Sequence, residues 1–510
     1  MADCKQLSSL YSKIINKKYR QFDPALSELS AAKFVREVAS KPTKVASHRF
    51  YPFIMYSQKQ ARYHRSRGHL RAHLKNKVRP IALVAHRDAL IYATYSSKLE
   101  QPYEEYLSKH NLERVPTAYR KKLKHSNINA AKEVFDFIVD TEKCWIIKGD
   151  FQGFFDNLRH KILKKNLCNV LQVSELSKDW QAVFNSLTRY RSVNSRELEL
   201  ATKNVGFSGD TSLPYVHNRQ DIEKLHKIAG LRFYGPNQVG IPQGTSLSAI
   251  LANVYMTEFD EKITNLTTNF GGMYRRYSDD FIIVVPQNRM STVNPTPFID
   301  DVRKLSDNLT KLTISKEKTK VFSYDKSAIS SKITLFKESQ DSTQSSEAWL
   351  DYLGFVFNGD IVRMRDKGVY KFHYKSKRAI DRFLRIENDR SQIQNNKIIP
   401  AERKQRKVWV GNKQILARIS AEPKRDLYKQ RIAWSRKNMD KNLTEAKLST
   451  RMYLSGRRYG EHFSMVGYAK RAQSILENNK GRYKVQVLSQ ITRQLHVNQV
   501  RVHKTREEHE

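Results

Sequence analysis

The chain has 510 residues and carries 92 Lys and Arg against 51 Asp and Glu, a formal net charge of +41 that indicates an extended polyanion, above all nucleic acid, as its partner. No apolar run approaches the roughly 18 residues of a transmembrane helix and the N-terminus lacks a signal-peptide pattern, so we expect a soluble, cytoplasmic protein with no membrane partner. The three cysteines, Cys4, Cys144 and Cys168, lack C-x-x-C spacing, which argues against a disulfide framework and a zinc site.

The N-terminal part is predicted to be a helical extension over residues 1–40, and a strongly basic stretch follows at residues 59–79. That stretch holds eight Lys or Arg and no acid, with tyrosine and histidine between them. Such a composition suits a groove that follows phosphates and stacks bases, although it is also typical of a solvated face. Residues 77–107 are expected to form an extended segment and then an amphipathic helix, and Ser126 is predicted to cap a helix over residues 128–140.

An apolar run over residues 144–150 is predicted to be a strand that ends in Asp150. A buried acid at the end of an apolar strand is costly unless it has a partner, so we interpret Asp150 as functional. Asp156 is predicted to cap a helix over residues 156–167 and is interpreted as structural. After an insertion-like region, residues 240–253 are expected to form a glycine-bracketed turn that leads into an apolar helix.

Two adjacent aspartates, Asp279 and Asp280, lie between runs of aromatic and β-branched residues at 274–277 and 281–285. These runs predict a β-hairpin with residues 278–280 at its tip. A solvated Ser-Asp-Asp turn is one interpretation of the pair. The other is a divalent metal site with Asp150 as a third ligand, because hard cations take oxygen ligands and offset the repulsion between carboxylates.

The remainder of the chain is predicted to become mainly helical. A helix at residues 300–312 is followed by a turn that carries Lys316, Lys318 and Lys320 into a strand. Residues 338–347 are expected to form a flexible loop, and residues 351–359 a strand and turn with exposed aromatic side chains. From residue 371 to the end there are 34 Lys or Arg against 13 Asp or Glu, so this region holds much of the positive charge.

Taken in chain order, these motifs resemble the palm motifs of reverse transcriptases over roughly residues 75–360. The character is similar to bacterial enzymes of the group II intron, retron and abortive-infection or "unknown group" types. Retron enzymes carry N-A-x-x-H where this chain has Glu133 in place of the His, so the abortive-infection type is favoured. The motifs are Asp150-Phe-Gln-Gly-Phe-Phe155, Gly240-Ile-Pro-Gln-Gly244, Tyr277-Ser-Asp-Asp280, the turn at Lys318 and Leu353-Gly-Phe355, with Arg79-Pro-Ile, Arg87-Asp and Ala118-Tyr-Arg120 similar to fingers motifs.

The resemblance implies an α+β, right-hand polymerase fold with fingers, a palm built on an antiparallel sheet, a helical thumb and an all-α basic C-terminal region. The implied boundaries are an extension at 1–40, fingers at 41–240 with a palm segment at 141–175, a palm at 240–360, a thumb at 361–430 and a helical basic extension at 431–510.

The resemblance also implies roles for single residues. Asp150, Asp279 and Asp280 would hold two Mg²⁺ ions, for which Mn²⁺ is an alternative, because nucleotidyl transfer needs charge neutralisation and in-line geometry. Lys318 would protonate the leaving pyrophosphate, with Lys320 as a rival. Phe155 resembles the steric gate that excludes a ribose 2′-OH, and a core aromatic is the simpler alternative. Arg79 and Arg120 would grip the triphosphate, Gln243 and Gly244 would shape the pocket of the templating pair, and Leu353, Gly354 and Phe355 would form the primer grip.

The implied function is RNA-templated DNA synthesis from dNTPs in bacterial antiphage defence. The implied partners are an RNA template, for which a dedicated non-coding RNA is a candidate, the DNA product and dNTPs, and a homo-oligomer is left open. One alternative is a template-independent or protein-primed DNA polymerase of the abortive-infection type. An alternative of another class is an RNA-binding maturase or scaffold.

Overall fold

The structure is a computed structural model that describes residues 14–15, 19–64, 73–207, 210, 213–290, 294–329, 332–336, 346–394, 406–410, 413–417, 441, 443–454 and 464–507. Most of the basic stretch at 59–79 and of the polar run at 338–347 lies outside the described side chains, so the predictions for both stay open. The chain forms two compact units, Met1–Ala348 and Trp349–Glu510. Their boundary falls inside the predicted palm.

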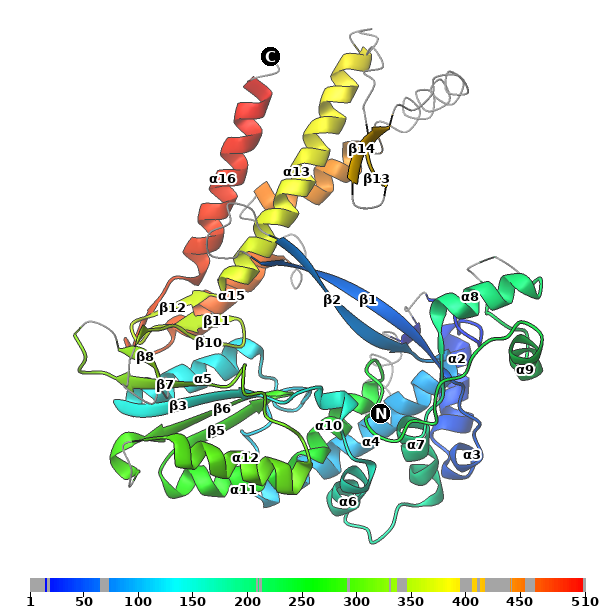
Figure 1. Cartoon of the computed structure of the whole chain (residues 1–510), viewed down its shortest axis with the longest axis horizontal. Helices are drawn as coiled ribbons and strands as arrows, with labels where there is room; N and C mark the ends of the chain where they lie inside the picture. The colour runs from blue at the N-terminus through cyan, green and yellow to red at the C-terminus, as the bar shows by residue number, and fades with distance from the viewer. Residues whose placement is uncertain are drawn as a thin grey trace. The chain divides into compact units, whose positions relative to one another are not determined.

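The first unit is built on a six-stranded antiparallel sheet with the strand order β5-β6-β3-β7-β8-β9. Helices cover both faces, with α11 and α12 on one side and α5 on the other (Figure 1). Both faces of β6 are therefore buried, as its continuous apolar run requires. The predicted hairpin and the predicted strand at 144–150 are confirmed. The strands are β3 (Lys143–Asp150), β5 (Met273–Tyr277), β6 (Asp280–Pro286), β7 (Lys320–Asp325), β8 (Ile333–Phe336) and β9 (Ser346–Glu347).

Most helices of the first unit bury apolar side chains in one continuous core with this sheet, whereas the helices at residues 195–204 and 219–227 pack in a second cluster around Ile54. Ser126 caps α5 as predicted, since its Oγ accepts a hydrogen bond from the Ile128 amide at 3.2 Å. The helices are α2 (Glu28–Phe34), η1 (Val35–Ala39), α3 (Pro42–Ala46), α4 (His86–Lys109), α5 (Asn127–Asp140), η2 (Phe154–Asp156), α6 (His160–Leu171), α7 (Lys178–Thr188), α8 (Ser195–Asn204), α9 (Arg219–Lys227), α10 (Ser246–Tyr255), α11 (Thr257–Asn269), η3 (Gln287–Arg289) and α12 (Thr296–Thr310).

A second sheet of the first unit is a long hairpin with one short added strand. β1 (Phe53–His64) pairs antiparallel with β2 (His73–Leu83), and β4 (Ser192–Asn194) pairs parallel with the start of β1. The amide of Ala82 in β2 donates to the carbonyl of Gln243 at 2.8 Å. This hydrogen bond ties the hairpin to the glycine-bracketed loop that precedes α10.

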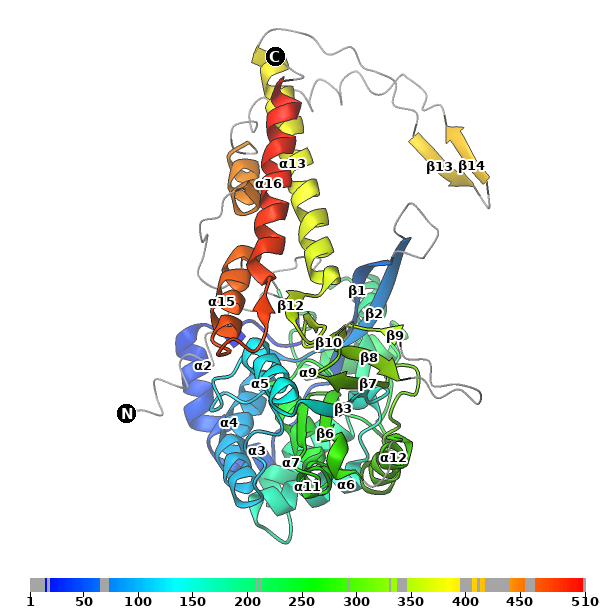
Figure 2. The same cartoon turned by 90° about the vertical axis from the view of Figure 1, so that its left-hand side faces the viewer.

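The second unit combines a small sheet with long helices. In the sheet, β10 (Leu350–Tyr352), β11 (Phe355–Phe357) and β12 (Ile361–Met364) are antiparallel neighbours, and β15 (Lys484–Val485) pairs parallel with β12. α13 (Asp366–Gln394) and α16 (Val487–Glu507) run side by side (Figure 2), joined by a hydrogen bond between Ser376 and Asn498, and α15 (Met465–Glu477) packs on α16.

Two predictions for this unit need correction. The C-terminal region is mainly helical but not all-α, because it also holds β15 and an antiparallel hairpin of β13 (Arg406–Val410) and β14 (Lys413–Ala417). The aromatic side chains expected to be exposed at 351–359 are buried, because the short strands fold onto each other and Tyr468 of α15 stacks on Phe355 with ring centroids 6.2 Å apart. No helix in the described part of the chain is both long and apolar enough to cross a membrane.

Candidate active site

Three aspartates from two distant segments meet at one end of the six-stranded sheet. The register of β3 and β6 places Asp150 directly opposite Asp280. The amide of Phe151 donates to the carbonyl of Asp279 at 3.2 Å, so the third acid also lies at this end. The antiparallel pairing therefore brings together the acids that the sequence predicted to act jointly.

The side chains of these acids do not converge as a set of metal ligands in this structure. Among the described residues, no group of three His, Cys, Asp or Glu is arranged to hold a metal ion. The Asp150 carboxylate instead accepts a hydrogen bond from the Lys318 ammonium at 2.5 Å. The Asp150 carboxylate therefore lies beside the positive charge of Lys318. The three carboxylates also offer the hard oxygen donors that Mg²⁺ prefers, so their chemistry fits this ion.

The hairpin tip that carries the paired acids is a tight two-residue turn. Tyr277 pairs with Asp280, so only Ser278 and Asp279 lie between the strands. Ser278 is buried and has a left-handed backbone with φ +60°. Its Oγ accepts a hydrogen bond at 3.2 Å from the hydroxyl of Tyr119, a residue that is otherwise half exposed. This contact links the fingers-like motif at residues 118–120 to the turn.

A buried arginine holds the same turn from inside. The side chain of Arg276 is 0% exposed and forms an ion pair with Asp260 of α11 at 2.6 Å. Its Nη1 donates to the carbonyl of Ser278 and to the side chain of Asn253, both at 3.1 Å. Burial alone would lower the pKa of Arg276, but the carboxylate of Asp260 raises it, so the guanidinium stays charged. The turn is therefore held by charge-assisted contacts as well as by its strands.

Neither Arg276 nor Asp260 was predicted from the sequence to have a role. The available signal was the period of two in β5, because Tyr274 on the same strand is buried and Arg276 lies two residues farther on the same face. A charged residue on the buried face of a strand needs a partner, but the sequence does not show which acid supplies it.

The segment after Asp150 turns sharply to place Phe155 beside the glycine-bracketed loop. Phe155 is half-buried against the core, and its carbonyl accepts from the amide of Ile241 at 2.9 Å. A Cβ on Gly240 would lie 2.6 Å from the carbonyl oxygen of Asp156, so only glycine permits this approach. The two motifs predicted to line one pocket are therefore in direct contact.

Asp156 does not cap a helix, and that prediction was wrong. Residues 154–156 form the 3-10 turn η2, and α6 begins only at His160. Burial raises the pKa of Asp156, and a hydrogen bond with the Gln243 side chain opposes this rise. The Asp156 carboxylate therefore holds Gln243, one of the residues predicted to shape the templating pocket.

Of the predicted cationic residues, Lys318 lies at the aspartates and Arg120 is engaged elsewhere. Arg120 is buried in a two-point ion pair with Glu104, with Nε and Nη2 at 2.8 and 2.6 Å from the carboxylate oxygens, and it also donates to the carbonyl of Pro116. Because this guanidinium is taken up by protein acceptors, we leave Arg120 out of the triphosphate site. Arg79 is exposed on β2, opposite Gln58 of β1.

The predicted primer grip lies in the second unit. Leu353 and Gly354 form the two-residue turn between β10 and β11, with φ of +46° and +95°. Phe355 is fully buried in the core of that unit. Leu353 and Gly354 are partly exposed, whereas Phe355 supports the turn from inside.

Replacing Gly244 with alanine is expected to destabilise the first unit. Gly244 has φ +132°, and a Cβ there would lie 2.4 Å from the carbonyl oxygen of Ala82 in β2. We expect Gly244→Ala to lower the free energy of unfolding by more than about 2 kcal/mol, since strain and a backbone clash add. The matched control is Gly230→Ala, which also has positive φ but no described atom within 4 Å of the new Cβ. Urea unfolding would show equal losses for both variants if the contact with β2 were unimportant.

An antiparallel sheet flanked by helices, with three acids gathered at one end, is the arrangement predicted for the palm of a nucleic-acid polymerase. The family described as reverse transcriptase (RNA-dependent DNA polymerase) matches residues 67–357, which is more than half of the chain, and the protein belongs to this family. The α+β class expected from the motifs is confirmed by the helices and antiparallel sheets of the described residues.

Known proteins similar to this chain are distant. Protein YkfC of Escherichia coli (strain K12) is 20% identical over 275 residues, which is 48% of this chain and 60% of YkfC. The chain therefore spans less than two thirds of that relative. Among solved structures, the apo telomerase of Candida tropicalis truncated from the C-terminal domain has 13% identity and a TM-score of 0.34, with 64% of this chain and 59% of that chain covered. The telomerase of Candida albicans in complex with a fragment of telomeric RNA has 12% identity and a TM-score of 0.33, with 68% and 54% covered.

Proposed function

We propose that the protein is an RNA-templated DNA polymerase that adds dNTPs to a primer 3′ end, with Asp150, Asp279 and Asp280 as its catalytic carboxylates. The observation that carries this proposal is the β3–β6 register, which sets Asp150 opposite Asp280 within a family of RNA-dependent DNA polymerases. These carboxylates would hold two Mg²⁺ or Mn²⁺ ions, which when bound supply charge neutralisation and orientation for in-line transfer.

Lys318 is proposed to protonate the leaving pyrophosphate. Its side chain is 60% exposed and lies against Asp150, whereas Lys320 lies opposite Lys148 on β3, farther from the strand end. We expect Lys318→Ala to slow single-nucleotide incorporation by about 10²-fold, the range typical of general acid catalysis. Lys320→Ala is the matched control and should change the rate little. Equal effects of the two variants in rapid-quench kinetics would remove the assignment.

Phe155 is proposed to exclude ribonucleotides by crowding the 2′-OH. Because its ring is only half-buried, it can also face a bound nucleotide. Phe155→Val should raise the incorporation of rNTPs relative to dNTPs by about 10-fold or more. The smaller side chain leaves room for the ribose 2′-OH, so rNTPs are no longer excluded by a steric clash. Phe154→Leu is a suitable control, because Phe154 is buried in the core. If Phe155→Val discriminates as the native protein does, Phe155 is a core aromatic only.

Arg79 and Gln243 are proposed to contact the incoming nucleotide and its templating partner. The support for Gln243 is that its side chain is held by Asp156 and its carbonyl by Ala82 of β2, so both ends of the residue are fixed. The support for Arg79 is its exposed position on β2, the strand that also holds Ala82. An exposed guanidinium there could form a bidentate contact with phosphate oxygens.

The proposal is tested by primer extension with the purified full chain. RNA and DNA templates of defined sequence are supplied with an annealed DNA primer and dNTPs, and the products are sequenced. DNA complementary to the RNA template supports the proposal. Product of unrelated sequence, or product covalently attached to the protein, would show an untemplated or protein-primed polymerase, and RNA binding without synthesis would show a maturase or scaffold.

The cellular role that we propose is bacterial antiphage defence, with a dedicated RNA as template and a homo-oligomer as a further possibility for the assembly. The support is the motif pattern, in which Glu133 departs from the retron signature. Phage plating on cells that produce the native chain or the Asp279→Ala variant tests this role. Equal plating on both strains would exclude it.

A further inference from the structure

A second segment of the chain runs beside the hairpin that carries the paired acids. This segment, residues 115–120, follows α4 and is called the strap below. It lies parallel to β5, with Pro116 opposite Arg276. The amide of Arg276 donates to the carbonyl of Val115 at 2.9 Å, and the amide of Thr117 donates to the carbonyl of Arg276 at 2.8 Å. The strap therefore adds a short parallel edge to the sheet, next to the turn with the paired acids.

The residues on either side of Tyr119 anchor the strap to two helices. The carbonyl of Ala118 accepts from the side-chain amide of Asn253, on α10, at 2.9 Å. Arg120 is held by Glu104 of α4 in the two-point ion pair described above. Tyr119 itself is 50% exposed. Its position is therefore set by its anchored neighbours and not by burial of its own side chain.

Two residues with a left-handed backbone meet where the strap reaches the turn. Tyr119 has φ +62° and Ser278 has φ +60°, a conformation that residues with bulky side chains rarely adopt. Such strain is costly and persists only where the surroundings fix it. The hydroxyl of Tyr119 donates to Oγ of Ser278 at 3.2 Å, and Ser278 is buried. The strained backbone of Tyr119 thus aims an exposed side chain at the turn, which indicates a function for this contact.

The contact acts on the backbone that directs Asp279. The carbonyl of Ser278 accepts from Nη1 of Arg276 at 3.1 Å, and the carbonyl of Asp279 accepts from the amide of Phe151 at 3.2 Å. These two carbonyls belong to the two planar peptide groups that flank Asp279, so fixing both planes fixes the direction of its side chain. The hydroxyl of Tyr119 adds an anchor on the Ser278 side chain, from the strap.

We propose that Tyr119 is a positioning residue for the paired acids. Its hydroxyl holds Ser278, so that Asp279 and Asp280 keep the direction in which they would hold a divalent ion. This inference rests on the proposed polymerase function and deepens it, because it assigns a role to the strap, which acts through Ser278 and not on the nucleotide. It also gives a reason for the ion pair of Arg120, which fixes the strap directly after Tyr119.

The test replaces Tyr119 with phenylalanine, which removes the hydroxyl and keeps the ring. Rapid-quench kinetics of the full chain then measure single-nucleotide incorporation over a range of dNTP and Mg²⁺ concentrations. We expect the maximal rate to fall about 10-fold, the effect of one lost hydrogen bond, with the apparent affinity for dNTP unchanged. The Mg²⁺ concentration for half-maximal rate at saturating dNTP should rise about 5-fold. Thermal unfolding should match that of the native chain, because Tyr119 is half exposed.

Metal binding is also measured without synthesis. Titration of the full chain with Mn²⁺, followed by electron paramagnetic resonance of the free ion, gives the affinity directly. Tyr119→Phe should weaken Mn²⁺ binding about 5-fold, which corresponds to the loss of one hydrogen bond that supports the site. Asp279→Ala combined with Asp280→Ala is the reference for loss of the site.

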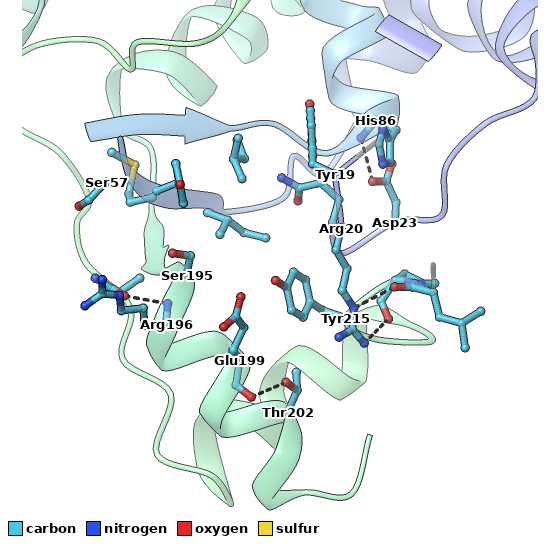
Figure 3. Close-up of a pocket in the computed structure, with 18 of the residues that line it drawn as sticks. Tyr19, Arg20, Asp23, Ser57, His86, Ser195, Arg196, Glu199, Thr202 and Tyr215 are labelled. Carbon is cyan, nitrogen blue, oxygen red and sulfur yellow. Dashed lines mark hydrogen bonds between the residues drawn. The ribbon is translucent and has the colours of Figure 1, made fainter. Parts of the chain in front are cut away.

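Tyr19→Phe is the matched control. Tyr19 is also partly exposed, and its hydroxyl donates to the carbonyl of Val84 at 3.1 Å. Figure 3 shows Tyr19 in the wall of a pocket of about 1520 Å³, and none of the described residues that line this pocket is proposed to be catalytic. This variant loses a similar hydrogen bond and should keep the native rate, Mg²⁺ dependence and Mn²⁺ affinity.

A double-mutant cycle shows whether the effect passes through Ser278. Ser278→Ala removes the acceptor, so its combination with Tyr119→Phe should be no slower than the slower single variant. Additive losses would overturn the proposal, and so would a Tyr119→Phe variant with the native rate and Mg²⁺ dependence.

Failure of the proposed function gives a different result, because synthesis then survives Asp279→Ala combined with Asp280→Ala. Hydrogen exchange over residues 273–286 tests the contact in that case too. Loss of the Tyr119 hydroxyl should speed exchange at the turn, whereas Tyr19→Phe should not. Unchanged exchange in Tyr119→Phe would mean that the hydroxyl does not hold the turn.

Discussion

Replacing both Asp279 and Asp280 with alanine is expected to abolish incorporation of dNTPs while the chain stays folded. Both residues lie at the tip of the β5–β6 hairpin and are only partly buried, so removing them leaves the core of the sheet intact. Loss of the carboxylates proposed to hold Mg²⁺ removes several kcal/mol of transition-state stabilisation, which corresponds to a rate loss of about 10³-fold or more. Extension of a labelled primer measures the rate, and circular dichroism with thermal unfolding measures the fold.

Two further measurements make this result specific. Asp300→Ala with Asp301→Ala removes an adjacent acidic pair from the exposed side of α12 and should leave the rate unchanged. Chelation of divalent ions should stop the native protein and should be reversed by added Mg²⁺ or Mn²⁺. Substantial synthesis by the double variant at the hairpin would mean that the paired acids are a solvated turn.

Replacing Arg276 with methionine is expected to cause the largest loss of stability of any single change proposed for this protein. The substitution leaves the carboxylate of Asp260 buried and without its cation, and Asp260 is itself 1% exposed. Breaking a buried ion pair from one side costs about 3–5 kcal/mol. Urea unfolding measures the loss, which should accompany weakened synthesis because the carbonyl of Ser278 loses its donor.

A paired substitution and a surface control separate the charge effect from packing. Arg276→Met combined with Asp260→Leu leaves no uncompensated charge, and it should recover much of the lost stability without recovering synthesis. Lys304→Ala breaks an exposed ion pair with Asp301 and should change stability by less than about 0.5 kcal/mol. If Arg276→Met costs no more than Lys304→Ala, the buried pair does not support the turn.

Local patterns predicted several elements because each depends on neighbouring residues. The hairpin at 273–286 follows from two apolar runs around a polar turn, and the start of α5 follows from Ser126. Asp156 shows where this reasoning fails. Its position before a helical pattern favoured a cap, but the turn η2 and the loop at residues 240–244 place its carboxylate against Gln243 instead. The prediction of exposed aromatics at 351–359 fails for the same reason, because Tyr468, which stacks on Phe355, is far away in the chain.

The sequence by itself determined that the chain has polymerase motifs in the family's order, a strand ending in Asp150, and a hairpin presenting Asp279 and Asp280. Those features depend only on residue types and short spacings along the chain, so they can be predicted from local structural preferences. Only the tertiary structure decided that Lys318 lies against Asp150, that Arg120 is paired with Glu104, and that Arg276, paired with Asp260, holds the turn at Ser278. Ion pairs between distant segments depend on strand register and helix packing, and no pattern within one segment specifies which charge the fold will bring to another.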